Sequence, residues 1–424
     1  MPTRNFSESR DDIDVLVNLN SAPLKILQIC HRVPFPPIDG GNIVMMNNAV
    51  GLADYGNEVY QFAINTKKHF TAAESIPKSI RDKVHFSSSL VDTKISLAGI
   101  LKNFFTSESY NVIRFYSESV ENDLKKILRE NKFDIVQLET LFASPYISCI
   151  RKHSDAKIVL RAHNVEHVIW ERLASNEKNF LKRRYIKFLA SRLRKCELNV
   201  LNEIEALIPI TNVDEATFRS EGFKKPMLTL PMSLDIEEYP INSKVQPEMC
   251  LFHLGSMDWL PNLEGVRWFL DNCWEEIHKL IPGLKLFLAG RSFPDDIVAK
   301  NYPNTFCEGR IEKAVSYMSD KQIMIVPLHS GSGMRVKIIQ GMALGKTIIS
   351  TTIGAEGIPI ENEKNILIAD SPQEFITQVK RCMENPEWCR KIGNSGRKFV
   401  EENYSNESVA RKLTEFYQQL NVPH

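Results

Sequence analysis

Residues 323–346 decide the fold and read Ile323-Met-Ile-Val-Pro-Leu328 followed by His329-Ser-Gly-Ser-Gly-Met-Arg335-Val-Lys337-Ile-Ile-Gln-Gly-Met-Ala-Leu-Gly-Lys346. The apolar run predicts a buried strand, the glycines predict a turn, and the residues after Arg335 predict a helix. Backbone N–H groups, the helix dipole and the cations Arg335 and Lys337 would then meet at one place. The stretch therefore predicts a binding site for a phosphate group.

The same stretch contains a segment that looks like a P-loop, Gly341-Met-Ala-Leu-Gly345-Lys346-Thr347. Only three residues separate its glycines where a P-loop needs four, and a strand follows it where a P-loop is followed by a helix. We interpret Gly345 as the C-cap of the helix and Lys346 as the turn residue after it.

Strand and helix patterns alternate along most of the 424 residues, which are more than one hydrophobic core usually holds. This alternation predicts an α/β protein with two Rossmann-like, doubly wound parallel sheets that face each other across a cleft. The predicted strands are residues 24–29, 58–64, 133–138, 157–161 and 205–210, and then 249–254, 284–289, 323–328, 347–351 and 366–368.

A polar, proline-containing stretch at 231–248 interrupts the alternation and is typical of a linker. The predicted organisation is an N-terminal extension (1–22), a first domain (23–230), this linker, a second domain (249–405) and a terminal amphipathic helix (406–424). Ligands of such sheets bind where the carboxyl ends of the strands open onto the cleft.

Composition narrows the class of protein. The net charge of +1 argues against a nucleic-acid partner, so an anionic ligand must be met by a local patch. The eight dispersed cysteines favour reduced thiols in the cytoplasm, and their spacing gives no metal site. We expect neither a secretion signal nor a membrane span, because no apolar run reaches the required length.

Five segments together resemble the GT-B glycosyltransferases of family 4. They occur in the order of that family and cover nearly the whole chain from residue 24 onward. In the first half they are Pro34-Phe-Pro-Pro-Ile-Asp-Gly40-Gly41 and Arg161-Ala-His163-Asn164-Val-Glu166-His167; in the second, Gly255-Ser-Met-Asp-Trp-Leu-Pro-Asn262, residues 326–347 and Gly354-Ala-Glu-Gly-Ile.

The resemblance implies a retaining hexosyltransferase that moves a sugar from a nucleotide-diphosphate sugar to a glycan or lipid-linked acceptor. The C-terminal domain would hold the donor, UDP- or GDP-linked, and the acceptor would enter over the N-terminal domain. It also implies that no metal or other cofactor takes part, so that side-chain cations and helix dipoles neutralise the leaving diphosphate. The terminal helix would pack back on the first domain.

The resemblance also suggests roles for individual residues. Arg335 and Lys337 would hold the diphosphate, and His163 would contact the donor sugar near the reacting carbon. Gln340 would bind the ribose, and Asn164 and Glu166 would lie on the acceptor side. The remaining donor-site candidates are Gly40, Gly41, Gly255, Gly331, Ser332 and Gly333.

Two departures from the family pattern affect the donor site. Most members carry glutamates at the positions of Ser332 and Gln340, and many carry an arginine and a lysine where this chain has Met257 and Asn262. Gln340 keeps an acceptor oxygen but loses the charge-assisted bond to ribose. We infer that Arg335 and Lys337 substitute for the missing pair of cations.

The segment from Lys178 to Lys195 is basic and interleaved with apolar residues. Such a helix suits an anionic membrane face and a lipid-linked acceptor, which would place the enzyme peripherally on the inner face of the membrane. It equally suits a domain helix whose apolar stripe, Phe180, Leu181, Tyr185, Phe188 and Leu189, packs into the core.

Two other functions remain open. The fold also supports sugar-nucleotide epimerases, which would need further acid–base carboxylates in the cleft. A catalytically silent nucleotide-binding protein would account for Ser332 and Gln340 in place of acids.

Overall fold

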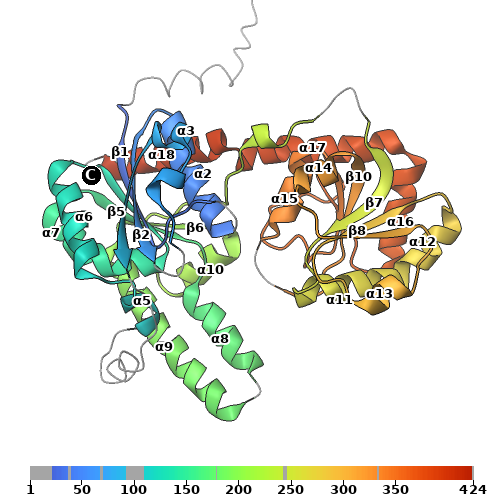
Figure 1. Cartoon of the computed structure of the whole chain (residues 1–424), viewed down its shortest axis with the longest axis horizontal. Helices are drawn as coiled ribbons and strands as arrows, with labels where there is room; N and C mark the ends of the chain where they lie inside the picture. The colour runs from blue at the N-terminus through green and yellow to red at the C-terminus, as the bar shows by residue number, and fades with distance from the viewer. Residues whose placement is uncertain are drawn as a thin grey trace, which may run out of the picture.

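The computed structural model describes residues 22–36, 40–66, 70–91, 109–177, 179–241, 246–331 and 334–422. Two separate six-stranded parallel sheets form the centres of two α/β domains (Figure 1). Both follow the same doubly wound plan, because each begins with an inner strand and winds outward in both directions. Their strand orders are β3-β2-β1-β4-β5-β6 and β12-β11-β10-β7-β8-β9. The predicted fold class is confirmed.

The first sheet carries a core of aliphatic and aromatic side chains on both faces, as buried parallel strands require. Its strands are β1 (Lys25–Cys30), β2 (Glu58–Thr66), β3 (Val84–Val91), β4 (Ile135–Glu139), β5 (Lys157–Ala162) and β6 (Ala206–Pro209). Its helices are α2 (Gly40–Asp54), α3 (Lys78–Arg81), α5 (Tyr110–Ile113), α6 (Glu118–Glu130), α7 (Ile147–His153), α8 (Glu166–Asn176), α9 (Phe180–Glu203) and α10 (Asn212–Ser220). Short 3₁₀ turns are η2 (Ala73–Ser75) and η3 (Leu141–Tyr146).

Strand β3 was missed by the sequence analysis. It reads Val-His-Phe-Ser-Ser-Ser-Leu-Val and lies at the edge of the sheet, where several of its side chains face solvent. A polar edge strand lacks the continuous apolar run that marks the inner strands.

The second sheet consists of β7 (Glu248–Leu254), β8 (Leu286–Ala289), β9 (Thr305–Gly309), β10 (Lys321–Val326), β11 (Thr347–Ser350) and β12 (Leu367–Ile368). Its helices are α11 (Leu260–Phe269), the π-helical turn η5 (Leu270–Trp274), α12 (Glu275–Leu280), α13 (Asp295–Ala299), α14 (Ala314–Ser319), α15 (Val336–Ala343), α16 (Pro372–Glu384) and α17 (Pro386–Tyr404). The strand, turn and helix predicted from residues 323–346 correspond to β10, the connection after it and α15. Gly345 follows α15 with φ +68°, and the backbone N–H of Lys346 donates to Gly341, so the predicted C-cap is confirmed.

The terminal helix α18 (Asn406–Asn421) crosses from the second domain to the first (Figure 1). Its apolar face, including Val409, Leu413 and Tyr417, joins the cluster formed by Ala49 and Leu52 of α2 and strands of the first sheet. Between β6 and β7 the chain passes through the short turn η4 (Ile236–Glu238). The N–H of Asn406 donates to Leu234 there, which ties this segment to the start of α18. The predicted return of the terminal helix to the first domain is confirmed, whereas the domain boundaries stay predictions.

Candidate active site

A cleft of about 500 Å³ lies at the carboxyl ends of the strands and is lined by residues of both domains. From the first domain it receives His163, Asn164 and Glu166, which follow β5, and Gly41 in the first turn of α2. From the second domain it receives Met334, Val336, Glu356 and Gly357. The first-domain segments singled out in the sequence therefore meet at one cavity.

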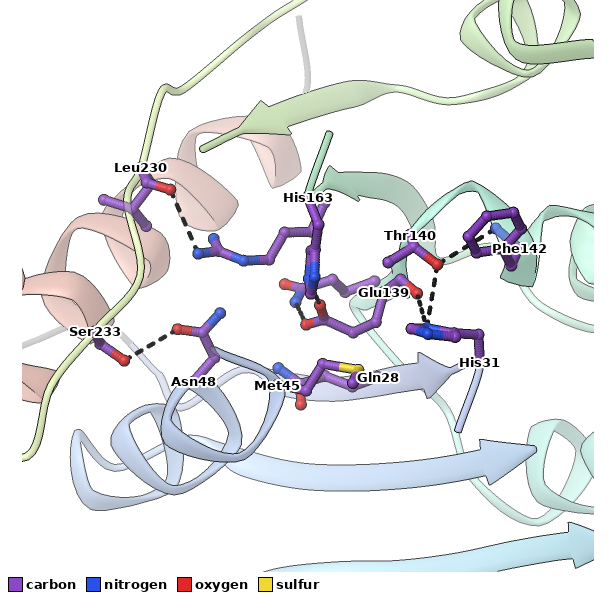
Figure 2. Close-up of polar contacts among 12 residues, drawn as sticks. Gln28, His31, Met45, Asn48, Glu139, Thr140, Phe142, His163, Leu230 and Ser233 are labelled. Atoms are coloured by element: carbon purple, nitrogen blue, oxygen red, sulfur yellow. Dashed lines mark hydrogen bonds and ion pairs between the residues drawn. The ribbon is translucent and has the colours of Figure 1, made fainter. Parts of the chain in front are cut away.

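His163 is held by a buried carboxylate at the floor of this cleft (Figure 2). Its Nε2 lies 2.8 Å from Oε2 of Glu139, the last residue of β4, and Glu139 is completely buried. The other oxygen of Glu139 accepts a bond from the amide of Gln137. The imidazole is thus fixed from behind, because a carboxylate can only accept hydrogen bonds from it.

His31 shares this end of the sheet with His163 and was missed by the sequence analysis. It follows β1 and lines the cleft, and its Nδ1 donates to the backbone oxygen of Glu139 at 3.3 Å. Oγ1 of Thr140 is also within 3.2 Å of that nitrogen. Thr140 has φ +79°, an uncommon backbone conformation for a β-branched residue, and such strain often marks a functional site.

Glu166 begins α8 and is nearly buried at the wall of the cleft. Burial raises the pKa of its carboxyl to about 7, with a further contribution from the charge of Glu197, while a bond from Asn164 acts in the opposite direction. Glu197 of α9 accepts bonds from the backbone N–H groups of Glu166 and His167 and from the His167 ring. Glu197 therefore caps the start of α8 through these backbone N–H groups. The side chain of Glu166 is not needed for this cap and lines the cleft.

Arg335 and Lys337 lie on the other side of the start of α15, facing the connection after β7 instead of lining this cleft. Nζ of Lys337 donates to Oδ1 of Asn262 at 2.8 Å. The guanidinium of Arg335 stacks on the ring of Trp259 with its carbon 5.1 Å from the ring centroid. Burial, and then the charge of Arg335, lower the pKa of Lys337 to about 7.

Gly331 and Gly255 lie at this second cluster, which we call the cation cluster (Trp259, Asn262, Gly331, Arg335 and Lys337). Gly331 has φ +102°, and a Cβ atom there would stand 2.9 Å from the Trp259 ring and 3.0 Å from the Arg335 guanidinium. Gly255 directly follows β7, and its neighbour Ser256 accepts a bond from the Asn262 amide. Ser332 and Gly333 lie outside the described residues.

Gln340, the predicted ribose ligand, is separate from both groups. Its amide nitrogen donates to the hydroxyl of Tyr239 at 3.0 Å, in the segment that connects the domains. The amide oxygen is the acceptor that a ribose hydroxyl would need, and that bond does not occupy it. Gly40 begins α2 at the same edge of the first sheet as Gly41.

The family model for glycosyl transferases group 1 matches residues 248–385, the stretch that carries the cation cluster. Over these residues the chain is similar to the group 1 glycosyltransferases. The match runs from β7 through α16 and thus covers all six strands of the second sheet. The family resemblance seen in the sequence is confirmed.

Relatives of this glycosyltransferase extend the likeness to both domains. A Klebsiella pneumoniae protein described as an uncharacterized 44.6 kDa protein in the cps region is 23% identical over 91% of this chain and 97% of its own length. Sucrose-phosphate synthase from Thermosynechococcus elongatus superposes with a TM-score of 0.63 at 16% identity, over 94% of this chain and 99% of that one. Anabaena HepE in complex with UDP gives 0.61 at 12% identity, over 93% and 100%. At these identities the structures show the shared GT-B fold.

Two residues of the candidate site gave no separable signal in the sequence. Gln137 lies inside a strand recognised only by its apolar neighbours, and Glu197 is one acid among several on a basic helix. Glu139 could have been found, because it directly follows the predicted strand 133–138. His31 could have been found, since it is a polar residue directly after a strand whose carboxyl end faces the cleft.

The apolar stripe of α9 is not packed in the way the core-helix interpretation requires. Phe180 and Leu181 are 62% and 76% exposed, and the side chains that α9 buries include Ile186, Ala190 and Leu193. Helices α8 and α9 extend as a pair away from the first domain (Figure 1). Among the described residues, no helix is long and apolar enough to cross a bilayer.

Proposed function

We propose that this glycosyltransferase moves a hexose from a UDP- or GDP-linked sugar to a glycan or lipid-linked acceptor. Two of the similar proteins support this proposal, because HepE was captured with UDP and the Klebsiella relative belongs to a cps region. Retention of configuration is proposed from family resemblance. In a front-face departure the leaving phosphate assists the incoming acceptor, so no covalent nucleophile is needed.

The observation that carries the proposal is the contact between Lys337 and Asn262. Many family members carry a phosphate-binding cation at the position of Asn262. Here the ammonium group of Lys337 reaches that position from α15, and the guanidinium of Arg335 is held beside it on Trp259. Two cations next to a glycine turn and a helix start suit the charge that develops on a leaving diphosphate.

Within this proposal, His163 contacts the donor sugar and Glu166 and Asn164 face the acceptor. Glu166 is suited to a proton exchange near neutral pH, because burial raises the pKa of its carboxyl to about 7. We propose that no metal or other cofactor is needed, since Arg335 and Lys337 supply the positive charge. Turnover should then be unchanged in the presence of a chelator.

Incubation with UDP-, GDP- and TDP-sugars tests the proposal. We expect slow hydrolysis of one donor with release of the nucleoside diphosphate, faster with a suitable acceptor, and loss of this activity in His163→Ala. An altered sugar still attached to its nucleotide would instead identify an epimerase. Saturable binding without turnover would identify a silent nucleotide-binding protein, the alternative favoured by Gln340 donating to Tyr239 where a glutamate is usual.

We further propose that the α8–α9 pair touches an anionic membrane surface, which would place the enzyme peripherally on a cytoplasmic face. The exposed Phe180 and Leu181 lie near Arg183, Arg184 and Lys187 on the same helix, and these cations are exposed as well. Apolar side chains inserted among lipids and cations at the headgroups reinforce each other. The pair also reaches the site, because Val168, Ile169 and Arg172 of α8 line the cleft.

Co-sedimentation with vesicles tests this surface. We expect binding to vesicles that contain phosphatidylglycerol, weaker binding to neutral vesicles, and loss of binding in a Phe180→Ser/Leu181→Ser variant. The matched control is Leu280→Ser/Val298→Ser, which removes two similarly exposed apolar residues of the second domain. Equal sedimentation of both variants, or none of the wild type, would refute the membrane surface.

A further inference from the structure

Three glutamines form a buried polar row across the first sheet. Gln61, Gln28 and Gln137 stand side by side on β2, β1 and β4, and none is more than 1% exposed. The amide of Gln61 donates to Oε1 of Gln28 at 3.2 Å. Buried amides cost free energy unless they are hydrogen-bonded, so apolar residues would be the simpler choice at these positions. The contacts that Gln137 makes, at the end of the row next to β5, suggest why these buried amides are present.

From Gln137 the row continues to the active-site histidine. The hydroxyl of Tyr417, on α18, donates to Oε1 of Gln137, and Nε2 of Gln137 donates to Oε1 of Glu139. Oε2 of Glu139 then accepts from Nε2 of His163 at 2.8 Å. Tyr417, Gln137 and Glu139 are all completely buried, so water does not compete for these bonds. The terminal helix is thereby connected to the floor of the cleft.

The buried charge of Glu139 is balanced by a neighbouring cation. Arg161 stands beside Glu139 in the register of β4 and β5 and is also completely buried. Burial lowers the pKa of Arg161, and the charge of Glu139 acts against this. The guanidinium donates to the backbone oxygens of Leu230 and Pro231. The two oxygens of Glu139 accept from Gln137 and His163 while the Arg161 guanidinium lies beside this carboxylate in the core.

We propose that Glu139 is a positioning residue that fixes His163 as the Nε2–H tautomer, and that Gln137 and Tyr417 fix the direction of Glu139. The hydroxyl of Tyr417 donates to the amide oxygen of Gln137, so the amide nitrogen of Gln137 faces Oε1 of Glu139. Oε2 of Glu139 is then left to accept from Nε2 of His163. The Nδ1 atom of His163 is then an acceptor, suited to a hydroxyl group of the donor sugar. The choice of partner rests on the proposed function, whereas the tautomer does not.

Glu139→Gln tests the proposal directly. Gln137 continues to donate toward the first oxygen position, so the new amide keeps its oxygen there and turns its NH₂ group toward His163. Nε2 of His163 must then accept, and its proton moves to Nδ1. Long-range ¹H–¹⁵N correlation spectra of ¹⁵N-histidine-labelled protein distinguish the two tautomers, with the His163 signals assigned from a His163→Gln sample. We expect Nε2–H in the wild type and Nδ1–H in the variant.

Kinetics separate this proposal from the proposed function. For donor turnover we expect kcat of Glu139→Gln to fall about tenfold or more, as a wrong tautomer does in other enzymes, with KM for the donor nearly unchanged. A wild-type Nδ1–H tautomer, or an unchanged tautomer in the variant, would overturn the positioning role. A change of tautomer with unchanged kcat would support positioning and remove the proposed role of His163.

A second variant covers the case in which Glu139→Gln does not fold. Tyr417→Phe removes the hydroxyl that donates to Gln137, and its matched control is Tyr404→Phe, since the buried Tyr404 hydroxyl has no partner among the described residues. We expect a shifted His163 ¹⁵N spectrum and a lower kcat only for Tyr417→Phe. Identical spectra for the two variants would show that the terminal helix does not orient Glu139.

Discussion

The two sheets have the same strand order and carry opposite arrangements at their carboxyl ends. In the first, a charged and polar network is sunk into the core and ends on His163. In the second, the charges come from outside the sheet, on a turn and a helix start, where Arg335 and Lys337 meet Trp259 and Asn262. Under the proposed function, the first domain would hold the His163 side chain in place, whereas the cations of the second domain would bind the charge of a ligand.

The largest effect is expected from removing the two cations of the second domain. Arg335→Gln/Lys337→Gln should weaken UDP or GDP binding about 10²- to 10⁴-fold, because each charge-assisted hydrogen bond contributes roughly 1.5–3 kcal/mol. Isothermal titration calorimetry measures the affinity. Lys364→Gln, an exposed lysine paired with Glu361, is the control and should change nothing. Unchanged affinity of the double variant would mean that the diphosphate is held elsewhere.

The next largest effect concerns the buried polar network of the first domain. Tyr417→Phe leaves the Gln137 oxygen buried without its donor, so the free energy of unfolding should fall by about 1–3 kcal/mol. Chemical denaturation measures this. The Tyr404 hydroxyl makes no hydrogen bond to any residue that the structure describes, so the midpoint of Tyr404→Phe should stay near that of the wild type. Equal stability of the two variants would show that the polar network adds nothing to the first domain.

The pH dependence sharpens the role of Lys337. Its pKa is lowered to about 7, so the ammonium form is present below this pH and is lost above it. Affinity for UDP-glucose, whose phosphates do not titrate in this range, should fall by up to about tenfold between pH 7 and 8.5. Lys337→Arg, which stays charged, should flatten the profile.

The lowered pKa of Lys337 predicts the opposite pH trend for the free energy of unfolding. Without ligand, the folded state binds fewer protons at Lys337 than the unfolded state between about pH 7 and the ordinary lysine pKa of 10.5. The contribution of this group to stability therefore rises with pH across that window. Parallel slopes for affinity and stability would contradict the assignment.

The smallest effect compares two glycines of the second domain. Gly331→Ala and Gly345→Ala both force a side chain into a left-handed conformation and should each cost about 1 kcal/mol of stability. Only at Gly331 would the new methyl group press on Trp259 and Arg335. Nucleotide affinity, measured by calorimetry beside thermal melting, should therefore fall for Gly331→Ala alone. A similar loss for Gly345→Ala would point to an effect of global stability.

Much of the fold was predictable, because it depends on local patterns. Residues 323–346 specified β10, the turn and α15, and the alternation of apolar runs with helical segments specified two parallel sheets. Strand β3 was not predictable, since its side chains are mostly polar and its pairing with β2 is decided by the sheet. The basic helix was predicted correctly as a helix, but its sequence could not reveal that Phe180 and Leu181 stay exposed.

The candidate site, like the fold, was only partly predictable from the sequence. His163, Asn164 and Glu166 follow one strand, and their position at the cleft follows from the parallel topology. Arg335 and Lys337 were expected beside a phosphate. Their placement against Trp259 and Asn262, about 75 residues earlier in the chain, needed the packing of α15 on the connection after β7.

The sequence by itself determined the family, the two α/β sheets and the polar residues at their strand ends, because periodicity, glycine turns and strand termini are local properties. The tertiary structure alone decided which groups act on one another. A tyrosine 280 positions away orients Gln137, and through it Glu139 and His163. Such partners are brought together by burial in a common core, and the separation of residues along a chain carries no record of that contact.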